Sequence, residues 1–289
     1  MPNVIERDKR VQDVPWALCK LPSFPPIAAR LLQALSKDDV EIRELTRLIS
    51  GDAAFSAEIL RLANSALFGM EARIDSLTHA VMLLGLSRVR GLAMTVAIMK
   101  GYLKGVLKSE TLRRCWTHSL ACALLAEEMA PACAVEKDYA YTGGLLHDIG
   151  RLSILVAYPA EYTNLLKVAE DNSFDVLDCE RQLFDIDHCE AGRWLAGQWN
   201  LPPEFGDILG RHHEPLTESR LGVVGLIHLA CQLSDTLGFS VLDAKLTPDI
   251  EQIASQMPPA MRERVELDPE DLKARIGGRI VALLRAPSN

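Results

Sequence analysis

His147 and Asp148 are adjacent and are the pair in this sequence best suited to chemistry. A neutral imidazole and a carboxylate are both good ligands for a borderline divalent metal ion. Adjacent residues of a helix point about 100° apart, so the pair can supply only part of one coordination sphere. Gly150 follows closely and is expected to end the helix that carries them. Other segments must therefore provide further ligands.

Further histidines and one aspartate fall on predicted inward helix faces or at helix ends in the second half of the chain. The apolar spacing over 111–129 places His118 on a buried stripe. Another stripe is shared by Val224, His228, Cys231 and Asp235. Any one histidine is more often a satisfied core residue than a ligand, but a carboxylate on an apolar stripe is costly without a cation or donor. The occurrence of these histidines and carboxylates together therefore predicts that they share a metal site. Its candidate ligands are His118, His147, Asp148, His188, His212, His213 and Asp235.

The elements that must position these residues have the period of amphipathic helices, and the first 105 residues contain no convincing alternating strand. Asp52 is expected to cap one helix, Asp185 or Asp187 another, and Gly85 to separate two more. The sequence therefore predicts an all-α fold. Helices are predicted over 26–35, 40–49, 53–63, 76–84, 87–103, 111–129, 161–171, 173–184, 185–199, 203–212, 221–237 and 269–285, with one more between 241 and 269.

Composition describes a globular protein of 289 residues, 48% hydrophobic and 24% charged. A net charge of −8 argues against general binding to nucleic acid or to anionic membranes, because no basic face can neutralise phosphates in bulk. The most apolar run, 80–99, contains Arg88 and Arg90 and so fails as a membrane span. The N-terminus lacks the apolar core of a signal peptide. The seven cysteines form no Cys-x-x-Cys pair, so we expect buried reduced thiols and a cytoplasmic protein.

Ordered motifs in both halves resemble those of the HDOD proteins, a family within the HD superfamily. The first half carries Leu-Pro-x-x-Pro, Ile-Leu-Arg-Leu-Ala-Asn-Ser and Ala-Val-x-Leu-Leu-Gly, at 21–25, 59–65 and 80–85. The second half carries Trp-x-His-Ser, Gly-Leu-Leu-His-Asp-Ile-Gly, Asp-His and His-His-Glu-Pro, at 116–119, 144–150, 187–188 and 212–215. The resemblance covers roughly residues 15 to 240.

This resemblance implies a bacterial signalling protein with a helical N-terminal subdomain (1–105), an HD-like metal-binding subdomain (106–240) and a helical extension (241–289). Many HDOD proteins have lost the metal ligands, whereas this chain keeps them. The related HD-GYP proteins are metal-dependent phosphodiesterases of cyclic dinucleotides. Here no Gly-Tyr-Pro follows Glu214, and Arg114 stands where a third metal would require glutamate. Hydrolysis of cyclic di-GMP is therefore disfavoured.

By the same resemblance, two divalent ions are expected. One would be held by His118, His147, Asp148 and Asp235, with Asp148 bridging to a second held by His188 and by His212 or His213. Mixed nitrogen and oxygen ligands suit iron, manganese, zinc or nickel. Such ions lower the pKa of bound water toward neutrality and yield a hydroxide that attacks phosphorus. Asp148, which would bridge the two ions, is therefore expected to be catalytic. Arg151 or Arg211 is suited to bind a substrate phosphate, although solvation at the surface is an equal alternative for each.

Three hypotheses remain from the sequence: a phosphohydrolase of a nucleotide or cyclic nucleotide, a signalling module with a structural or ligand-sensing metal, and a metal-free interaction scaffold. A phosphate ligand and a signalling protein partner are expected, and neither direct nucleic-acid binding nor membrane association is. We identify no receiver, diguanylate-cyclase or DNA-binding segment in these residues, so output is expected to pass through another protein.

Overall fold

The computed structural model describes residues 15–35, 42–64, 73–101, 103, 109–214, 216, 221–242 and 248–284. Within these ranges every regular element is a helix and no residue lies in a strand, so the predicted all-α fold is confirmed. No helix in the described ranges is long and apolar enough to cross a membrane. The predicted break at Gly69, the predicted helix start at Val40 and the end at Pro215 lie outside the described residues.

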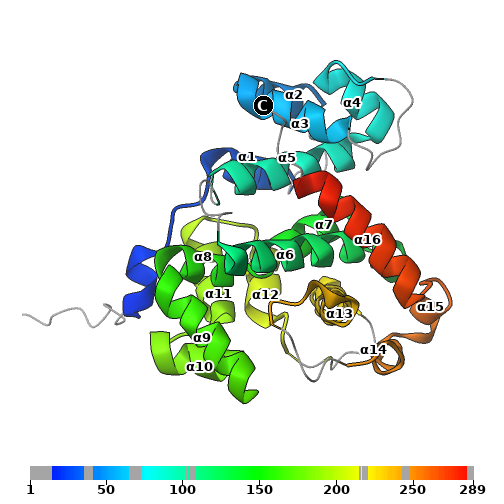
Figure 1. The fold of residues 1–289 in the computed structure, drawn as a ribbon. Helices are drawn as coiled ribbons and strands as arrows, with labels where there is room; N and C mark the ends of the chain where they lie inside the picture. The colour runs from blue at the N-terminus through cyan, green and yellow to red at the C-terminus, as the bar shows by residue number, and fades with distance from the viewer. Residues whose placement is uncertain are drawn as a thin grey trace, which may run out of the picture.

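The N-terminal helices gather at one end of the molecule, coloured blue to cyan in Figure 1. Asp52 and Ser76 cap two of them by accepting hydrogen bonds from the backbone N–H groups of Phe55 and His79. Gly85 has a φ of 86° and separates the last two, as its position predicted. The helices gathered there are α1 (Pro26–Leu35), α2 (Ile42–Ser50), α3 (Ala53–Ala63), α4 (Leu77–Leu84) and α5 (Leu86–Gly101). The short helix η1 (Trp16–Lys20) lies apart from them (Figure 1), with Trp16 packed on Tyr158 and Phe184.

The central region of the fold is built around one long helix, α6, which contacts α7, α8, α13 and α16 (Figure 1). Apolar residues lie on most sides of α6, including the fully buried Trp116 and Leu120, as expected for a helix covered all round. The helices of this region are α6 (Glu110–Met129), η2 (Ala130–Cys133), α7 (Lys137–Leu146), α8 (Ile149–Ala157), α9 (Pro159–Asn172), α10 (Val176–Phe184), α11 (His188–Gln198), α12 (Pro203–Arg211), α13 (Val223–Ser234) and the π-helical turn η3 (Asp235–Phe239).

The C-terminal residues form α14 (Ile250–Gln256), the single turn α15 (Pro259–Arg262) and α16 (Pro269–Leu284). The predicted last helix is confirmed, and the residues before it form two short helices rather than one. Helix α16 crosses α6 (Figure 1) and is joined to it by ion pairs. Arg279 bonds Glu127 at 2.5 Å and Glu128 at 3.2 Å.

A seam joins the N-terminal helices to the central region where α5 meets α7. Gly91 allows close approach, because a Cβ there would lie 3.1 Å from the ring of Tyr141. The Tyr141 hydroxyl lies 2.7 Å from Thr95 Oγ1, and both groups are buried. The Arg90 side chain is mostly buried and pairs with Asp138 at 3.6 Å.

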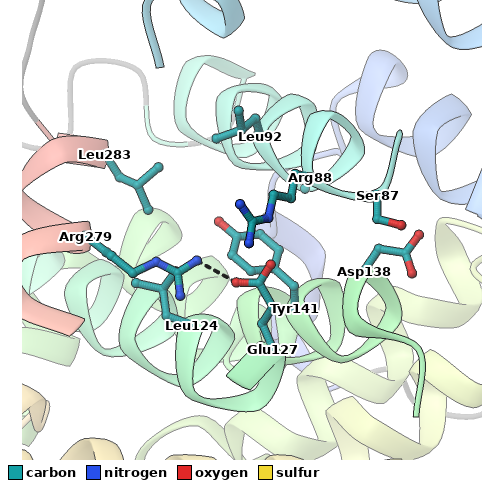
Figure 2. A pocket seen from close by; sticks show the side chains of 10 residues that line it. Ser87, Arg88, Leu92, Leu124, Glu127, Asp138, Tyr141, Arg279 and Leu283 are labelled. Atoms are coloured by element: carbon teal, nitrogen blue, oxygen red, sulfur yellow. Dashed lines mark hydrogen bonds and ion pairs between the residues drawn. The ribbon is translucent and has the colours of Figure 1, made fainter. Parts of the chain in front are cut away.

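The same seam is hollowed into a pocket of about 340 Å³ between α5, α6, α7 and α16 (Figure 2). Both apolar and charged side chains line it, and Arg279 pairs with Glu127 beside Tyr141 (Figure 2). It is lined by Ser87, Arg88, Gly91, Leu92, Leu124, Glu127, Asp138, Tyr141, Arg279 and Leu283. None of the candidate metal ligands lines this pocket, so the chemistry predicted from the sequence lies elsewhere.

Candidate metal centre

His147 and Asp148 occupy a turn between two helices. Helix α7 ends at Leu146, the pair forms the turn, and α8 begins at Ile149. The prediction that Gly150 ends the helix is wrong, since Gly150 lies inside α8. His147 keeps helical backbone angles and Asp148 departs from them, and the His147 ring lies 3.9 Å from the Asp148 carboxylate. His147 and Asp148 can therefore both face the centre from one short segment.

Gly150 is required by packing. A Cβ at this position would lie 2.0 Å from the His188 carbonyl oxygen and 2.6 Å from the Gly192 nitrogen. Only a residue without a side chain allows α8 to approach the first turn of α11 this closely. Gly144 acts similarly, because a Cβ there would lie 2.7 Å from the Ala123 Cα of α6. These two glycines bring the turn between α6 and α11, the helices that carry His118 and His188.

His118 projects from α6 with its two ring nitrogens in different surroundings. Nδ1 lies 3.1 Å from the Phe239 carbonyl oxygen and 3.1 Å from Ser234 Oγ. Nε2 points inward and lies 3.3 Å from Nε2 of His147. His147 in turn directs Nδ1 to the Gly144 carbonyl oxygen at 2.6 Å.

His188 and His212 approach from the opposite side, at the start of α11 and just after α12. Asp187 caps α11 in a capping box with Glu190, so of the two predicted caps Asp187 is the one used. Nδ1 of His188 lies 2.7 Å from Oε2 of Glu180, and Nδ1 of His212 lies 3.2 Å from two backbone carbonyls of α12. Both rings turn Nε2 toward Asp148.

The Nδ1 contacts set the tautomers of the buried rings. Backbone carbonyls and an ionised carboxylate only accept hydrogen bonds, so each ring donates from Nδ1 and presents Nε2 to the centre. Asp148 Oδ1 lies 3.3 Å from Nε2 of His188 and 3.5 Å from Nε2 of His212. This oxygen is buried and has no hydrogen-bond partner among the described residues. Imidazole nitrogens that converge on a buried carboxylate oxygen fit a divalent cation.

Sequence comparison places this arrangement in a family. The family model described as the HDOD domain matches residues 21–215. The chain belongs to the HDOD family. Its match spans most of the N-terminal helices and of the histidine cluster, which confirms the resemblance inferred from the motifs.

Individual relatives of this HDOD protein agree in fold. A structure of an HDOD domain protein of unknown function from Geobacter sulfurreducens is 26% identical, with a TM-score of 0.73 and 91% of each chain covered. A Shewanella amazonensis SB2B structure that carries the provisional name of a phosphohydrolase is 23% identical, with a TM-score of 0.69 and coverage of 93% and 97%. An uncharacterized protein of Treponema pallidum (strain Nichols) is 28% identical over 197 residues. The match covers 67% of this chain but only 37% of the length of that relative.

Arg151 lies inside the cluster, with only 6% of its surface exposed. Its Nε donates to Asp148 Oδ2 at 2.7 Å, and its guanidinium also contacts Tyr162 and His188. Glu180 lies 3.8 Å away. The guanidinium is thus held by buried protein groups, and its predicted contact with a substrate phosphate would require these bonds to be exchanged.

Burial and neighbouring charges together set which groups of the centre are ionised. Burial favours neutral groups, but Arg151 and the histidines hold the pKa of Asp148 well below its usual value. Burial lowers the pKa of His147 far below its usual value, so this ring is neutral. Burial and Arg151 also oppose protonation of His188, yet Glu180 and Asp148 raise its pKa to about 10. Against the same effect of burial, Asp148 and Cys189 raise the pKa of His212 to about 9. Without a metal, protons on these two rings balance the carboxylates.

Two predicted ligands lie at the edge of the centre. The carboxylate of Asp235 is about one-third exposed and lies 3.3 Å from Nδ1 of His118, on the side of the ring away from His147. His213 is exposed, and its ring centroid lies 4.4 Å from that of His212 and 5.1 Å from that of His188. The structure therefore brings His118, His147, Asp148, His188 and His212 together in the interior, with Asp235 and His213 outside them.

The sequence did not identify Glu180, Cys189 or Cys231 as parts of the site. Glu180 is fully buried and binds both the backbone N–H and the ring of His188, but nothing in its sequence context distinguishes it from a surface acid. Cys231 Sγ lies 3.5 Å from Nε2 of His118, and its helical register with Asp235 was a usable signal. The expected buried thiols are confirmed at Cys115, Cys122, Cys189 and Cys231, whereas Cys19 is exposed and the other two are partly buried.

Proposed function

We propose that this HDOD protein is a signalling protein whose histidine cluster binds divalent metal. The observation that carries the proposal is the convergence of His147, Asp148 and His212, in which the buried Oδ1 of Asp148 has no hydrogen-bond partner among the described residues. His118 adjoins this group, with its Nε2 3.3 Å from Nε2 of His147. The Nε2 atoms of His118 and His147 can share at most one hydrogen bond. A cation in this cluster could be ligated by imidazole nitrogens and by the buried oxygen of Asp148.

Some residues around the proposed cation would be its ligands, and others orient those ligands. His147, Asp148 and His212 lie close enough together to hold one ion, with His118 beside His147, and Asp148 could reach a second ion beside His188. Glu180 fixes the tautomer and orientation of His188, and Phe239 does the same for His118 through its carbonyl. A bound divalent ion supplies a Lewis acid that lowers the pKa of coordinated water toward neutrality. The donor set admits iron, manganese, zinc or nickel.

Metal content tests this proposal directly. In Asp148→Asn the side chain keeps its shape but loses the charge that attracts the cation, so we expect purified protein to lose most of its bound metal by elemental analysis. Asp178→Asn, on the exposed face of α10, is the control and should keep it. Circular dichroism checks that both variants fold. Equal metal content in wild type and Asp148→Asn, or none in wild type under metal supplementation, contradicts the proposal.

Hydrolysis of a phosphoester is the second candidate function. It is favoured by the exposure of Asp235 and His213, which lets solvent and a ligand reach the edge of the cluster. The phosphohydrolase name of the Shewanella relative points the same way. The test is turnover of bis(p-nitrophenyl) phosphate and of nucleotides with added manganese or iron. Metal binding without turnover across these substrates would leave a structural or ligand-sensing centre.

We also propose that the division at residues 105 and 240 has functional meaning. The N-terminal helices would serve as the contact region for a signalling partner, while the central region holds the metal. The seam between Gly91 and Tyr141 would let the state of one part influence the other. Binding of partner proteins by the full chain, with substitutions of exposed residues on the N-terminal helices, would test this arrangement.

A further inference from the structure

A second group of potential ligands lies on the His188 side of the cluster and contains a thiol. Two adjacent pairs face one another there: His188 and Cys189 in the first turn of α11, and His212 and His213 directly after α12. One ligand atom from each residue lies within 4.8 Å of all the others. The thiol is 7% exposed, and its Sγ lies 3.9 Å from Nε2 of His212.

The packing of α11 accounts for this position of the thiol. Gly192, one turn after His188, lets the helix approach α12, since a Cβ there would lie 3.2 Å from Leu209. The first turn of α11 is thereby held against the end of α12, from which His212 and His213 emerge. At 3.9 Å, near the upper limit for a sulfur contact, a thiol–imidazole hydrogen bond is weak. A metal–sulfur bond would stabilise this position of the thiol more than the weak hydrogen bond does.

We propose that Cys189 is a thiolate ligand of a metal ion held together with His188, His212 and His213. This inference rests on the proposed metal-binding function. When the ion binds, the thiol proton passes to solvent and sulfur donates an electron pair to the metal. Three imidazoles and one thiolate make a complete tetrahedral set, the arrangement of closed structural zinc sites. The thiolate favours zinc or iron over manganese and magnesium, which prefer oxygen ligands.

Cobalt substitution tests the ligand assignment. Thiolate ligation of Co²⁺ gives an intense sulfur-to-metal charge-transfer band in the near ultraviolet, which nitrogen and oxygen ligands do not give. We expect this band in the full chain loaded with Co²⁺ and its loss in Cys189→Ser. Cys179→Ser, at a partly buried thiol on α10, is the matched control and should keep the band. We also expect Cys189→Ser to lower the preference for Zn²⁺ over Mn²⁺ by about tenfold or more.

A measurement on the unaltered protein guards against misfolding of the variant. Bound Zn²⁺ should slow alkylation of Cys189 by iodoacetamide at least about tenfold, followed by peptide mass spectrometry, because a ligated thiolate is shielded. Bound metal with no charge-transfer band and no protection of Cys189 would overturn this inference while leaving metal binding intact. A band that persists in Cys189→Ser but disappears in Cys231→Ser would overturn it in favour of the other thiol. Absence of any bound metal in wild type overturns both proposals.

Discussion

Glu180 shows how one buried side chain can orient a metal ligand from outside the ligand set. It accepts hydrogen bonds from the His188 backbone and ring at 2.8 and 2.7 Å, and from the Tyr162 hydroxyl. It also lies 3.8 Å from Arg151. Although burial opposes its ionisation, His188 and Arg151 lower the pKa of Glu180, so the buried carboxylate is charged. The charge of Glu180 therefore keeps the ring of His188 in place.

Replacing Glu180 by Gln should weaken metal binding without removing a ligand. The amide keeps the size of the side chain but loses the charge that holds the His188 ring. Loss of such a hydrogen-bond partner of a metal ligand typically lowers metal affinity by about 10- to 100-fold. We expect a fall of that order in calorimetric titration with Zn²⁺. Asp178→Asn on the same helix should bind like wild type, and an unchanged affinity in Glu180→Gln would show that the carboxylate does not support the ligand.

The raised pKa values of His188 and His212 predict opposite effects of pH on the free and the metal-bound protein. Both folded values, about 10 and about 9, exceed the unfolded value near 6.5. Their contribution to stability is therefore complete below about pH 6.5 and is lost as pH rises through 9 to 10. Metal must displace these protons, so its affinity should increase about tenfold per pH unit for each proton released.

Thermal unfolding at several pH values checks this prediction. Between pH 6.5 and 9, the Tm of metal-free protein should fall, and the increase in Tm caused by a fixed Zn²⁺ concentration should become larger. His188→Gln removes one of the two protons, so its metal-induced shift should depend less steeply on pH. A metal-induced shift that stays constant across this range would mean that neither ring exchanges a proton for the ion.

Helix contacts, rather than helix propensities, set the geometry of the centre. Glycine is a poor helix former, yet α8 contains Gly150 because the backbone of α11 passes within van der Waals contact. A similar approach at Gly144 joins α7 to α6. The histidines carried by α6 and α11 meet the central turn only because these helices lie so close together.

Gly150→Ala should therefore destabilise the protein strongly. The added Cβ would overlap the His188 carbonyl oxygen at 2.0 Å, so α8 and α11 must separate. We expect a loss of about 3 kcal/mol or more of unfolding free energy in denaturant titration, together with weaker metal binding. Gly278→Ala, in open space on α16, should instead stabilise by about 0.5–1 kcal/mol. Similar effects of the two substitutions would contradict the close approach.

At the level of the complete chain, the N-terminal helices and the metal-binding region share one apolar core. The seam at Tyr141 is buried, and burial raises the pKa of its hydroxyl to about 12. At the same seam, α16 is tied to α6 through Arg279 and Glu127. These joints connect residues far apart in sequence, so the parts are expected to unfold together.

Metal binding should accordingly protect helices that hold no ligand. In hydrogen exchange followed by mass spectrometry, Zn²⁺ should slow exchange in peptides of α3 as well as α6 wherever exchange requires global unfolding. Tyr141→Ala removes the ring that fills the seam, and we expect it to cost about 3–5 kcal/mol and to abolish protection of α3 by metal. If Zn²⁺ does not change the exchange rate of α3 in the wild-type chain, the two parts unfold independently.

The sequence by itself determined the helical fold, the family and most cap positions, because apolar period, capping residues and ordered motifs are local properties of the chain. Asp52 and Asp187 cap helices as expected, whereas Gly150 fails as a helix end because its role is to admit a distant backbone. Only the tertiary structure decided which groups lie beside His188 and His118. Glu180 reaches His188 from α10, Cys189 meets His212 from another helix, and Cys231 approaches His118 from α13, so each contact depends on how the helices pack.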